Sequence, residues 1–571
     1  MMEYPNKILE TDVLIIGSEA AGARAAIEAS KHGLDVSIIT KGRMTKSGAT
    51  ITAIMDMSID SRSAKKLLGL PGDERDSPEL YFEDIVKSGA YMNNQKLVEL
   101  HVKEAPLRAK ELQDWGLRWD TVNKLPGHRF ARSCMSTGVA LMATLKYEVL
   151  KLNVKVFEDT MALEFLKSKG KILGVIALDL GTGNLMVFKS KSTVLATGGA
   201  AQVYLHSTTA KEMVGDGYAM AYRAGAEFVD MEFPQFMPAA YLWPPIVRGH
   251  PASANMLWTL NGWLLNKYGE RFLANWDPER MEKTTRDVET RAIWNEIQEG
   301  RGSTRGGIFA SLAHLPERII TDFIEDPSKA HLKWTYEAAD VAKEKVMEII
   351  PHSHFFDGGL RINEKCETNL KGLFAAGEVA GGLNGGNRLS GVAIAQTQVQ
   401  GANAGKTAAD YALKNPSSEE IDEKAIEDMV KKCRSSLDAK EGLSPIKTRV
   451  KVQELAWQKI GLVRNETDLK LAISEIALLK KDVPKLCTQN KSSIYNQEWV
   501  NALEIENMLC VLEMISRGAL MRTESRATHV RSDYQKMDNQ NWLKNIIIKQ
   551  VNGEMKLTTN PLIVTRLNPI A

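Results

Sequence analysis

The stretch that decides the fold is TDVLIIGSEAAGARAAIEASKHGLDVSIITK, residues 11–41. It starts with a polar boundary and an apolar strand over 13–16, turns at Gly17, and continues in a helical run that opens at Gly22. A second strand over 36–39 is followed by Thr40 and Lys41. This order predicts the βαβ unit of a parallel sheet with a dinucleotide at its first turn. The spacing is G-x-G-x-x-G except that Glu19 stands at the middle position, so an ordinary, tightly packed βαβ unit is an equally good interpretation of these residues alone.

Length and charge bound the class of protein. The chain has 571 residues, enough for two to four domains and a large core. Apolar residues make up 44% and charged residues 25%, as in ordinary globular proteins. The formal net charge is +2, so no strong overall field favours nucleic acid or anionic lipid as a partner.

Cysteine use and the absence of targeting patterns point to a cytoplasmic protein. The cysteines are dispersed and form no C-x-x-C pair, which argues against a zinc site or a resident iron–sulfur cluster and suits a reducing compartment. They are Cys134, Cys366, Cys433, Cys487 and Cys510. No signal peptide and no run of about 18 apolar residues is visible, so we expect no direct membrane span, although attachment through a partner remains open.

Two further glycine-rich segments follow apolar strands. In STVLATGGAAQVY (192–204) the strand ends at Thr197 and Gly198, which leaves bare backbone at the sheet edge. In GLFAAGEVAGGLNGGNRLSGVAIAQTQVQGANAG (372–405) Glu378 is placed to bond a ribose hydroxyl, and Ala393 and Ile394 open a helix whose backbone can contact a flavin ring. A plain glycine turn explains the first segment as well, but the second is too long to be explained by packing alone.

The rest of the chain alternates in character. Short strands with turns at Gly174 and 181–183 fill 153–200. Residues 236–352 are rich in Trp, Pro and charged residues, and residues from about 405 to 545 are mostly helical, with ETDLKLAISEIALLKKDV (466–483) as an amphipathic example. A hairpin is predicted around Asn552-Gly553.

The order of these segments resembles the flavoprotein subunit of succinate dehydrogenase and fumarate reductase. The likeness covers nearly the whole chain and includes further motifs in the same order. They are DGYAMAYRAGAEFVDMEFPQF (216–236), NKYGERF (266–272), TTRDVETRAI (284–293), EGRG (299–302), HFFDGGLRI (354–362) and the helical segment 506–542.

The resemblance implies an α/β plus α architecture. A two-part, Rossmann-like FAD-binding domain is expected over 1–235 and 354–425, with an inserted α+β capping domain at 236–353. A C-terminal helical domain follows at 426–545 and a β-hairpin tail at 546–571. In this family the substrate lies between the capping domain and the flavin.

The resemblance also implies the site. FAD is expected in contact with Gly17, Glu19, Gly22, Thr40, Lys41, Ser47, Gly48, Thr197, Gly198, Asp216, Glu378, Ala393 and Ile394. Flavin N5 exchanges hydride with one carbon of a dicarboxylate in this family. Arg286 then handles the proton at the other carbon, while His354 and Arg388 hold carboxylate oxygens, and no metal is implied. Guanidinium groups suit carboxylates because they bond them in a bidentate manner, and they polarise a double bond toward hydride attack. For each of these residues a structural ion pair is the alternative interpretation.

Departures from the family pattern put the substrate in doubt. Met237 and Ala239 stand where a substrate-binding histidine and a threonine are expected, and Asn255 and Trp258 replace the glutamate and arginine of the family's proton relay. An arginine supplied by a shifted loop, VRGHP (247–251), is an alternative source for that relay. A thioether and a methyl group cannot hold a carboxylate. The half of the site near the flavin is kept, so a related acid, a larger enoate, a thioester or another conjugated acceptor is expected. Trp243, Trp258 and Trp263 either line a larger pocket for it or belong to the core.

Flavin attachment and electron supply also differ from complex-bound relatives. Ser47 is followed by Gly48 where those relatives carry the histidine that bonds covalently to the flavin, so FAD is expected to be non-covalent. That change favours substrate reduction. Because this chain offers no cluster-binding cysteine pattern, a separate iron–sulfur subunit is the expected electron partner, as in electron transport of anaerobic respiration.

Two other interpretations remain open at this point. One is an L-aspartate oxidase-like or adenylylsulfate reductase-like flavoenzyme, the latter suggested by SGAT at 47–50. The other is an electron-relay flavoprotein that has kept FAD and lost the dicarboxylate site.

Glu19 needs an explanation in any interpretation that places a pyrophosphate at the first turn. Arg24, Lys41 and Arg43 are close in sequence and are candidate partners for its charge. Its position before a helix also predicts a capping role for the carboxylate.

Overall fold

A computed structural model of the chain describes residues 7–53, 55–252, 254–326, 330–415 and 423–569. The chain forms two compact units. Unit 1 consists of residues 1–203, 210–234 and 355–571, and unit 2 consists of residues 204–209 and 235–354.

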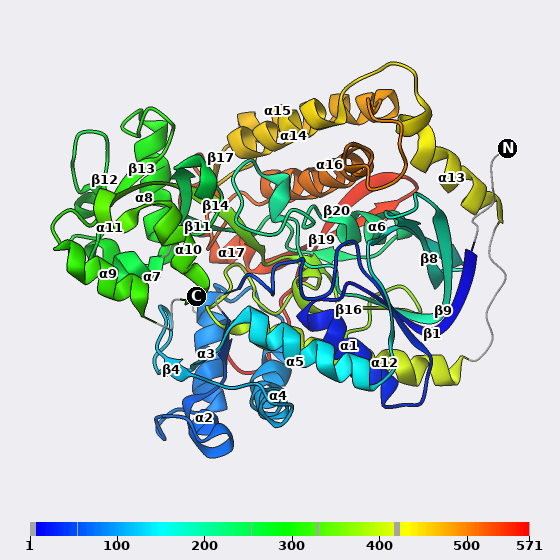
Figure 1. The fold of residues 1–571 in the computed structure, drawn as a ribbon, viewed down its shortest axis with the longest axis horizontal. Coiled ribbons are helices and arrows are strands. Elements are labelled where there is room, and N and C mark those ends of the chain that lie inside the picture. The colour runs from blue at the N-terminus through cyan, green and yellow to red at the C-terminus, as the bar shows by residue number, and fades with distance from the viewer. Residues whose placement is uncertain (1–6, 54, 253, 327–329, 416–422, 570–571) are drawn as a thin grey trace. The chain divides into compact units, whose positions relative to one another are not determined.

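A mixed sheet forms the centre of unit 1 (Figure 1). Its order is β6 (Lys155–Phe157), β2 (Val36–Ile39), β1 (Lys7–Ile16), β9 (Leu185–Leu195), β8 (Lys171–Asp179) and β7 (Thr160–Ser168), with β16 (Leu373–Ala375) also beside β9. Strands β6, β2, β1, β9 and β16 pair in parallel, whereas β9, β8 and β7 pair antiparallel. The parallel half is the predicted βαβ unit, and it brings the ends of β1, β2 and β9 to one edge.

Close backbone packing joins the helices of the parallel half. Helix α1 (Ala20–Ser30) packs on α12 (Val392–Lys414) and α5 (Gly138–Lys151), and the three lie together in Figure 1. A Cβ atom at Gly405 would lie 2.2 Å from the Ala25 carbonyl oxygen, so α12 approaches α1 at a contact that requires glycine. Helix α1 begins at Ala20, two residues earlier than the glycine pattern predicted, and this adds backbone N–H groups next to Gly17.

Smaller elements complete this side of unit 1. They are β3 (Asp56–Ser58), α2 (Ser61–Leu68), α3 (Pro78–Ser88), α4 (Gln95–Asp114), β4 (Thr121–Asn123), β5 (Ser133–Met135) and α6 (Asp216–Ala224). The predicted turn at 181–183 joins β8 to β9, but Gly174 lies inside β8. A Cβ atom there would lie 1.9 Å from the Phe188 carbonyl oxygen, so Gly174 permits close pairing within the sheet.

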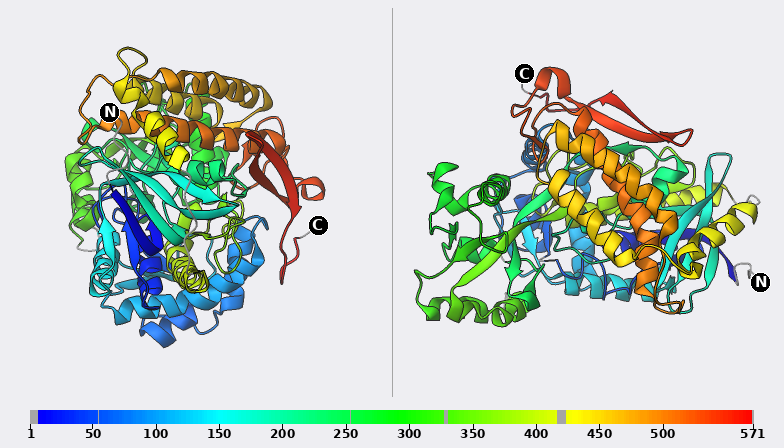
Figure 2. Two further views of the ribbon diagram at one scale, coloured as in Figure 1. Left: turned by 90° about the vertical axis from the view of Figure 1, so that its right-hand side faces the viewer. Right: turned by 90° about the horizontal axis from the view of Figure 1, so that it is seen from above.

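The C-terminal part of unit 1 is helical, as predicted. It contains α13 (Glu423–Asp438), α14 (Pro445–Lys459), α15 (Glu466–Asp482) and α16 (Gln497–Met521), and the last three pack side by side (Figure 2). The amphipathic segment 466–483 is confirmed as α15, capped by Asn465. Two short strands, β17 (Val463–Arg464) and β18 (Val530–Arg531), pair in parallel, and α17 (Asn539–Trp542) follows.

The predicted hairpin is also confirmed. Strands β19 (Lys544–Val551) and β20 (Glu554–Pro561) pair antiparallel around Asn552 and Gly553, whose φ angles are 51° and 83°. Positive φ at both positions is the two-residue turn that Asn-Gly favours. Strand β19 joins β10 (Phe228–Val229) and β15 (Gly359–Leu360) in a four-stranded sheet.

Unit 2 is an α+β unit built on its own sheet. The strand order is β11 (Pro234–Trp243), β14 (Val346–Phe356), β13 (Ile308–Ser311) and β12 (Trp263–Leu265). Its helices are α7 (Ala254–Thr259), α8 (Arg286–Gln298), α9 (Glu317–Glu325), α10 (Ala330–Ala338) and α11 (Val341–Glu344). Across the described residues of the whole chain, no helix combines the length and apolarity needed to cross a membrane.

Candidate functional site

The first turn of unit 1 is built from glycines that other residues cannot replace. Gly17 has a φ of 107°, and a Cβ atom on it would lie 2.2 Å from the Ala196 carbonyl oxygen at the end of β9. A Cβ atom on Gly22 would lie 1.9 Å from the Gly17 carbonyl oxygen. The turn therefore brings bare backbone to the N-terminus of α1, where unpaired N–H groups and the helix dipole favour an anion.

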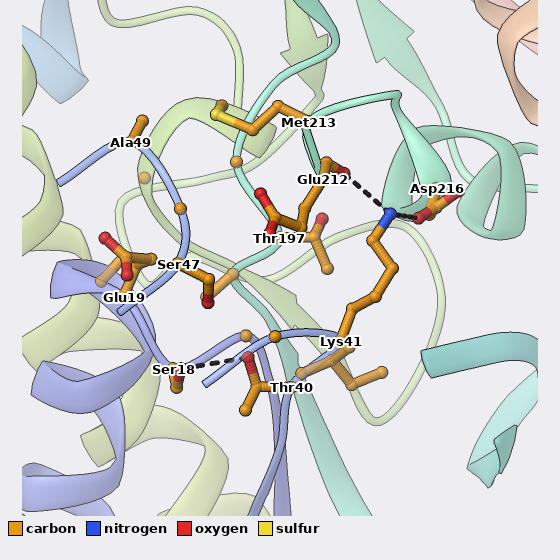
Figure 3. Close-up of a pocket in the computed structure, with 18 of the residues that line it drawn as sticks. Ser18, Glu19, Thr40, Lys41, Ser47, Ala49, Thr197, Glu212, Met213 and Asp216 are labelled. Atoms are coloured by element: carbon orange, nitrogen blue, oxygen red, sulfur yellow. Dashed lines mark hydrogen bonds and ion pairs between the residues drawn. The ribbon is translucent and has the colours of Figure 1, made fainter. Parts of the chain in front are cut away.

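A cavity opens at this turn and extends along the carboxyl ends of β1, β2 and β9 (Figure 3). Among the predicted cofactor residues, those that line it are Gly17, Glu19, Thr40, Lys41, Ser47, Gly48, Thr197, Gly198, Asp216 and Glu378. Three predicted residues do not line it. Gly22 acts through the packing of the turn, while Ala393 and Ile394 lie in the first turn of α12, a helix that reaches the cavity through Thr397.

The cavity also contains residues that sequence reasoning missed. They include the loop at 49–50, the start of β7 at 160–162, Glu212, Met213 and Thr397. The start of β7 reaches the cavity because the Thr160 N–H donates to the Thr40 carbonyl at 2.8 Å. Ser18 donates from its hydroxyl to Thr40 Oγ1 at 3.0 Å. These contacts join segments far apart in sequence, and no local pattern marks them.

Glu19 is held by the loop opposite through one carboxyl oxygen, and not by a cation, while its other oxygen, Oε1, is buried without a hydrogen-bond partner among the described residues. Its Oε2 accepts the Thr50 N–H at 2.9 Å, and a Cβ atom on Gly48 would lie 2.5 Å from its carboxyl carbon. Its side chain thus occupies the space above Gly48. Burial raises the pKa of Glu19 to about 7, although the Thr50 N–H opposes this rise.

The predicted partners of Glu19 were wrong. Arg24 pairs with Glu28 and Glu111, and Arg43 pairs with Asp159 at 3.1 Å. Lys41 pairs with Asp216 and Glu504. The capping prediction was also wrong, because Glu19 is the N-cap residue of α1 but its side chain makes no capping hydrogen bond.

Glu378 closes another side of the cavity. It lies in a 3₁₀ turn over Gly377–Val379, and its Oε1 accepts the Phe356 N–H at 3.0 Å. A Cβ atom on Gly199 would lie 2.1 Å from that same oxygen, so the second glycine of the Gly198-Gly199 pair makes room for the carboxyl group. Burial raises the pKa of Glu378 to about 7 against the Phe356 N–H bond.

Arg388 lies in unit 1, in the loop before α12. Its guanidinium stacks over the Phe355 ring with 4.4 Å between its Cζ and the ring centroid. The positive charge of Arg388 lowers the pKa of the buried Asp357, but burial outweighs this effect and raises that pKa well above its ordinary value. The same loop is held from the other side by His128, whose Nε2 lies 2.8 Å from the Ser390 carbonyl. A neutral ring is expected there, since burial lowers the pKa of His128 to about 4.

Arg286 lies in unit 2 as the first residue of α8, where the family resemblance puts the proton-handling arginine. Its Nη1 lies 4.0 Å from the Sδ atom of Met237 on β11, so the thioether occupies the expected histidine position beside it. One helical turn along α8, Glu289 is 2% exposed and its Oε2 has no hydrogen-bond partner. Burial raises the pKa of Glu289 to about 8; the positive charge of Arg286 opposes this rise, and the negative charge of Glu282 adds to it.

His354 lies in unit 2 on β14, the strand beside β11. Its ring is nearly perpendicular to that of His352, with 6.1 Å between centroids. Burial lowers the pKa of His352 to about 3, so His352 is neutral at physiological pH.

Two of the tryptophans named from the sequence, Trp243 and Trp263, stack with a cation or a ring. Trp243 is 44% exposed and stacks with Arg305, and Trp263 stacks on His314 with 4.4 Å between ring centroids. The side chains of Asn255 and Trp258, the positions of the missing relay, lie outside the described part of the structure.

The cavity of unit 1 fits FAD. A dinucleotide needs close backbone at the pyrophosphate, an anion-favouring helix end and carboxylates for ribose hydroxyls. Gly17, the N-terminus of α1 and Asp216 supply these three features. No cluster of histidine, cysteine and acidic side chains suited to a metal occurs among the described residues, and four of the five cysteines are buried as free thiols.

Comparison with known proteins agrees with this geometry. Residues 12–394 match the family model of an FAD binding domain, and residues 449–571 match that of the fumarate reductase flavoprotein C-terminus. The chain is 36% identical over 560 residues to one of the subunits of the fumarate reductase (CoM/CoB) of Methanothermobacter marburgensis, and this match covers 95% of this chain and 98% of that protein. It is 29% identical over 619 residues to the fumarate reductase flavoprotein subunit of Helicobacter pylori, covering 97% of this chain and 84% of that one.

Solved structures show the same fold. Mycobacterium smegmatis Sdh1 in complex with UQ1 superposes with a TM-score of 0.88 at 30% identity, covering 99% of this chain and 96% of that chain. Adenylylsulfate reductase from Archaeoglobus fulgidus superposes with a TM-score of 0.77 at 20% identity, covering 98% and 97%, and shares the fold. These matches cover nearly the full length of the chain. The glycine turn, the cavity and the C-terminal helices therefore all point to the same family. The chain belongs to the flavoprotein family of fumarate reductase and succinate dehydrogenase subunits, and it is an FAD-dependent oxidoreductase.

Proposed function

We propose that this chain is the catalytic subunit of an enzyme that transfers hydride between flavin N5 and a C=C or CH–CH bond next to a carboxylate. The observation that carries the proposal is the surroundings of Arg286. This arginine begins α8 with a thioether at 4.0 Å and a buried carboxyl group one turn away, so it is a cation in partly buried surroundings. In such surroundings its charge acts strongly on a bound substrate.

Each cationic or donor residue has a role that its chemistry supports. When bound, FAD supplies the hydride exchange. Arg388 and His354 hold the carboxylate of the substrate, with the guanidinium giving bidentate geometry. Arg286 delivers the proton to the second carbon. Because an arginine has a pKa above ~12, it needs a neighbour that can return the proton, and Glu289 is the buried titratable group one turn along its own helix.

The substrate is a carboxylic acid with an apolar second end. In the family, a histidine and a threonine hold the second carboxylate, but here Met237 and Ala239 stand at those positions on β11. Ala239 is 4% exposed and Met237 contacts Arg286, so both are part of the packed surface of unit 2. A monocarboxylic enoate or a larger conjugated acceptor is therefore a better substrate than fumarate.

Electrons pass to or from a separate iron–sulfur subunit. The relatives from M. marburgensis and H. pylori are subunits, and the dispersed, mostly buried cysteines of this chain give no cluster-binding pattern. The complex acts in the cytoplasm, with membrane attachment, if any, through its partners. Co-purification of a protein with the visible absorption of an iron–sulfur cluster tests this route, and a complex without such a protein excludes it.

FAD is held without a covalent bond. Gly48 offers no nucleophile, and the side chain of Glu19 fills the space in which a larger residue 48 would begin. Acid denaturation should release all of the flavin into solution. Flavin fluorescence that stays with the precipitated protein would contradict this.

The decisive experiment is the reoxidation of the reduced flavin by acceptors. We expect enoates with one carboxylate to bleach the reduced signal faster than fumarate does. Arg286→Ala should abolish this reoxidation while the flavin stays bound. Arg291→Ala is the matched control, since Arg291 lies on the same helix in a partly exposed ion pair with Asp287. If the protein binds flavin but no acceptor of the panel reoxidises it, the proposal is wrong.

One other function has an observation in its favour. The thioether beside Arg286 is what an electron-relay flavoprotein without a substrate site would tolerate. Such a protein would exchange electrons with its partner and react with no enoate, so the same acceptor panel separates the two functions. An adenylylsulfate reductase activity is supported by shared fold alone.

A further inference from the structure

Lys41, just after β2, uses all three N–H donors of its ammonium group in hydrogen bonds within the protein. Its Nζ donates to the Glu212 carbonyl at 2.8 Å, to Asp216 Oδ2 at 2.6 Å and to Glu504 Oε1 at 2.9 Å. An ammonium has three N–H donors, so none remains for a phosphate. Burial lowers the pKa of Lys41, but the carboxylates of Asp216 and Glu504 more than reverse this and raise it above its ordinary value. Lys41 is therefore a fixed cation that holds two carboxylates in place.

Asp216 is the carboxylate at the position where a dinucleotide fold needs one. In βαβ dinucleotide folds an acidic residue at the end of the second strand accepts hydrogen bonds from the adenosine ribose. Here the second strand ends in Thr40 and Lys41, with no acid. Asp216, the first residue of α6, lines the cavity and is brought to that strand end by Lys41 (Figure 3). Its other oxygen accepts from Asn507 Nδ2 at 2.8 Å.

The second anchor of Lys41 comes from the C-terminal helices. Glu504 and Asn507 lie three residues apart on α16, so they share one face of this helix. Glu504 is 2% exposed, and its second oxygen pairs with Arg449 on α14. Asn507 is held in turn by Arg223 Nη1 at 2.8 Å. Every carboxylate oxygen of Asp216 and Glu504 therefore has a partner, and the partners come from α14, α16 and the loop after β2.

We propose that Glu504 of the C-terminal helical region is a positioning residue of the FAD pocket, which holds Lys41 and through it sets the Asp216 carboxylate for the adenosine end of the cofactor. Removing the charge of Glu504 leaves Lys41 with one carboxylate and Arg449 without a counter-charge. Asp216 is then drawn out of its place. The C-terminal helices, 463 residues along the chain from Lys41, thus control how firmly FAD is held.

The test compares FAD with FMN, which lacks the adenylate half. Apoprotein of the full chain is titrated with each flavin, and quenching of flavin fluorescence gives the dissociation constant. For Glu504→Gln we expect FAD to bind about tenfold to hundredfold more weakly, because a hydrogen-bonded charge pair is lost. FMN affinity should stay within about twofold. Glu504→Asp should recover part of the FAD affinity.

Glu513→Gln is the matched control. Glu513 is also a carboxylate on α16 with two cationic partners, Lys480 and Arg517. It does not touch Lys41 or the cavity, so both flavins should bind as they do to the unmodified protein. Equal weakening of FAD and FMN by Glu504→Gln, or unchanged FAD binding, would overturn the proposal.

A measurement on the unmodified protein covers the case in which the variant does not fold. Amide hydrogen exchange of residues 501–508 should slow when FAD is added to apoprotein and should not slow with FMN. Exchange in α16 that does not respond to FAD would equally overturn the role of Glu504. Neither measurement depends on which substrate the enzyme reduces.

Discussion

We expect the carboxyl group of Glu19 to make FAD binding sensitive to pH near neutrality. Its pKa is raised to about 7 by burial, above the ordinary value of 4.5. In the folded apoprotein this group keeps its proton between these two values, so the stability it contributes is fully present below about 4.5 and is lost as pH rises through about 7. The pyrophosphate of FAD is an anion and adds to the same effect, since it disfavours an ionised carboxylate in the same cavity.

FAD affinity should therefore fall as pH rises through about 7, by at most about tenfold per pH unit. Glu19→Gln keeps an acceptor for the Thr50 N–H without a titrating group, so its FAD affinity should be nearly independent of pH across this range. The measurement is a flavin titration of apoprotein at each pH. Glu212→Gln, at another carboxyl of the cavity, should keep the pH dependence with a slightly lower midpoint, because Glu212 adds to the raised pKa of Glu19. A Gln variant of Glu19 that keeps the full pH slope would show that another group is responsible.

We expect Met237 to influence which acids the enzyme accepts. Met237→His places a donor at the position whose thioether now lies 4.0 Å from Arg286 Nη1. If the second carboxylate of fumarate lies there, the new donor should lower the KM for fumarate by about tenfold or more, the effect of one hydrogen bond to a charged group. Steady-state rates with fumarate and with a monocarboxylic enoate give the ratio. Met237→Leu, which adds no donor, should leave that ratio unchanged; a histidine variant with the same ratio would remove Met237 from the substrate site.

If Glu289 returns the proton to Arg286, the reoxidation rate of the reduced enzyme should depend on pH. Burial raises its pKa to about 8, so below this pH it carries the proton that can be passed toward Arg286. The rate at which reduced enzyme is reoxidised by an enoate should fall as pH rises through about 8. In Glu289→Gln the rate should be lower and this inflection should disappear, as stopped-flow traces at a series of pH values will show. Glu299→Gln at the end of the same helix should keep it, and a Gln variant of Glu289 with an unchanged profile would assign the inflection to another group.

Helices, strands and turns were predicted correctly where a local sequence pattern determines them. Strand β2, helix α15 and the Asn552-Gly553 hairpin follow from hydrophobic period and turn chemistry, and all three are confirmed. The prediction of a turn at Gly174 was wrong because a glycine that permits close strand pairing looks the same in sequence as one that turns the chain. The start of α1 was missed by two residues because Ala20 and Ala21 carry no start signal.

The same limit explains the cofactor cavity. Glycines and strand ends located part of its lining, because a βαβ turn constrains both. The partners of the charged residues could not be found in this way. Sequence neighbours were proposed for Glu19, whereas its bond comes from Thr50 and the bonds of Lys41 come from α6 and α16. Electrostatic pairing is decided by packing between distant elements, which the pattern of one element does not encode.

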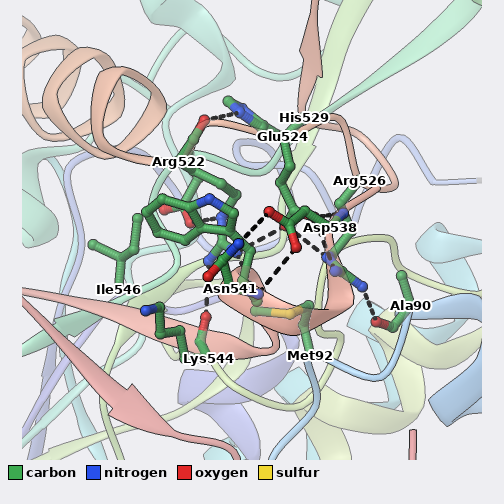
Figure 4. Close-up of polar contacts among 12 residues, drawn as sticks. Ala90, Met92, Arg522, Glu524, Arg526, His529, Asp538, Asn541, Lys544 and Ile546 are labelled. Carbon is green, nitrogen blue, oxygen red and sulfur yellow. Dashed lines mark hydrogen bonds and ion pairs between the residues drawn. The ribbon is translucent and has the colours of Figure 1, made fainter. Parts of the chain in front are cut away.

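At the scale of the whole molecule, a buried network of charges ties the C-terminal segment into unit 1 (Figure 4). Arg522, just after α16, is fully buried and donates to Glu232 at 2.7 Å and to Glu524 at 3.2 Å. It also donates to the backbone carbonyls of Trp542 at 3.1 Å and Lys544 at 3.1 Å, which lead into the hairpin. One guanidinium thus joins α16, α17, β19 and the chain before β11.

Arg522→Ala should therefore destabilise the protein far more than the loss of a surface ion pair. It leaves the carboxylate of Glu232 buried without its counter-charge, whereas Glu524 keeps its ion pair with Arg526, and breaking a buried pair in this way costs roughly 3–5 kcal/mol. Arg517→Ala is the control, because Arg517 is 40% exposed in an i,i+4 pair with Glu513, where the expected cost is below about 1 kcal/mol. Thermal unfolding followed by circular dichroism should show a large fall in midpoint for Arg522→Ala and a small one for Arg517→Ala. Similar midpoints for the two variants would mean that apolar packing of α16 and β19, and not this network, holds the C-terminal segment in place.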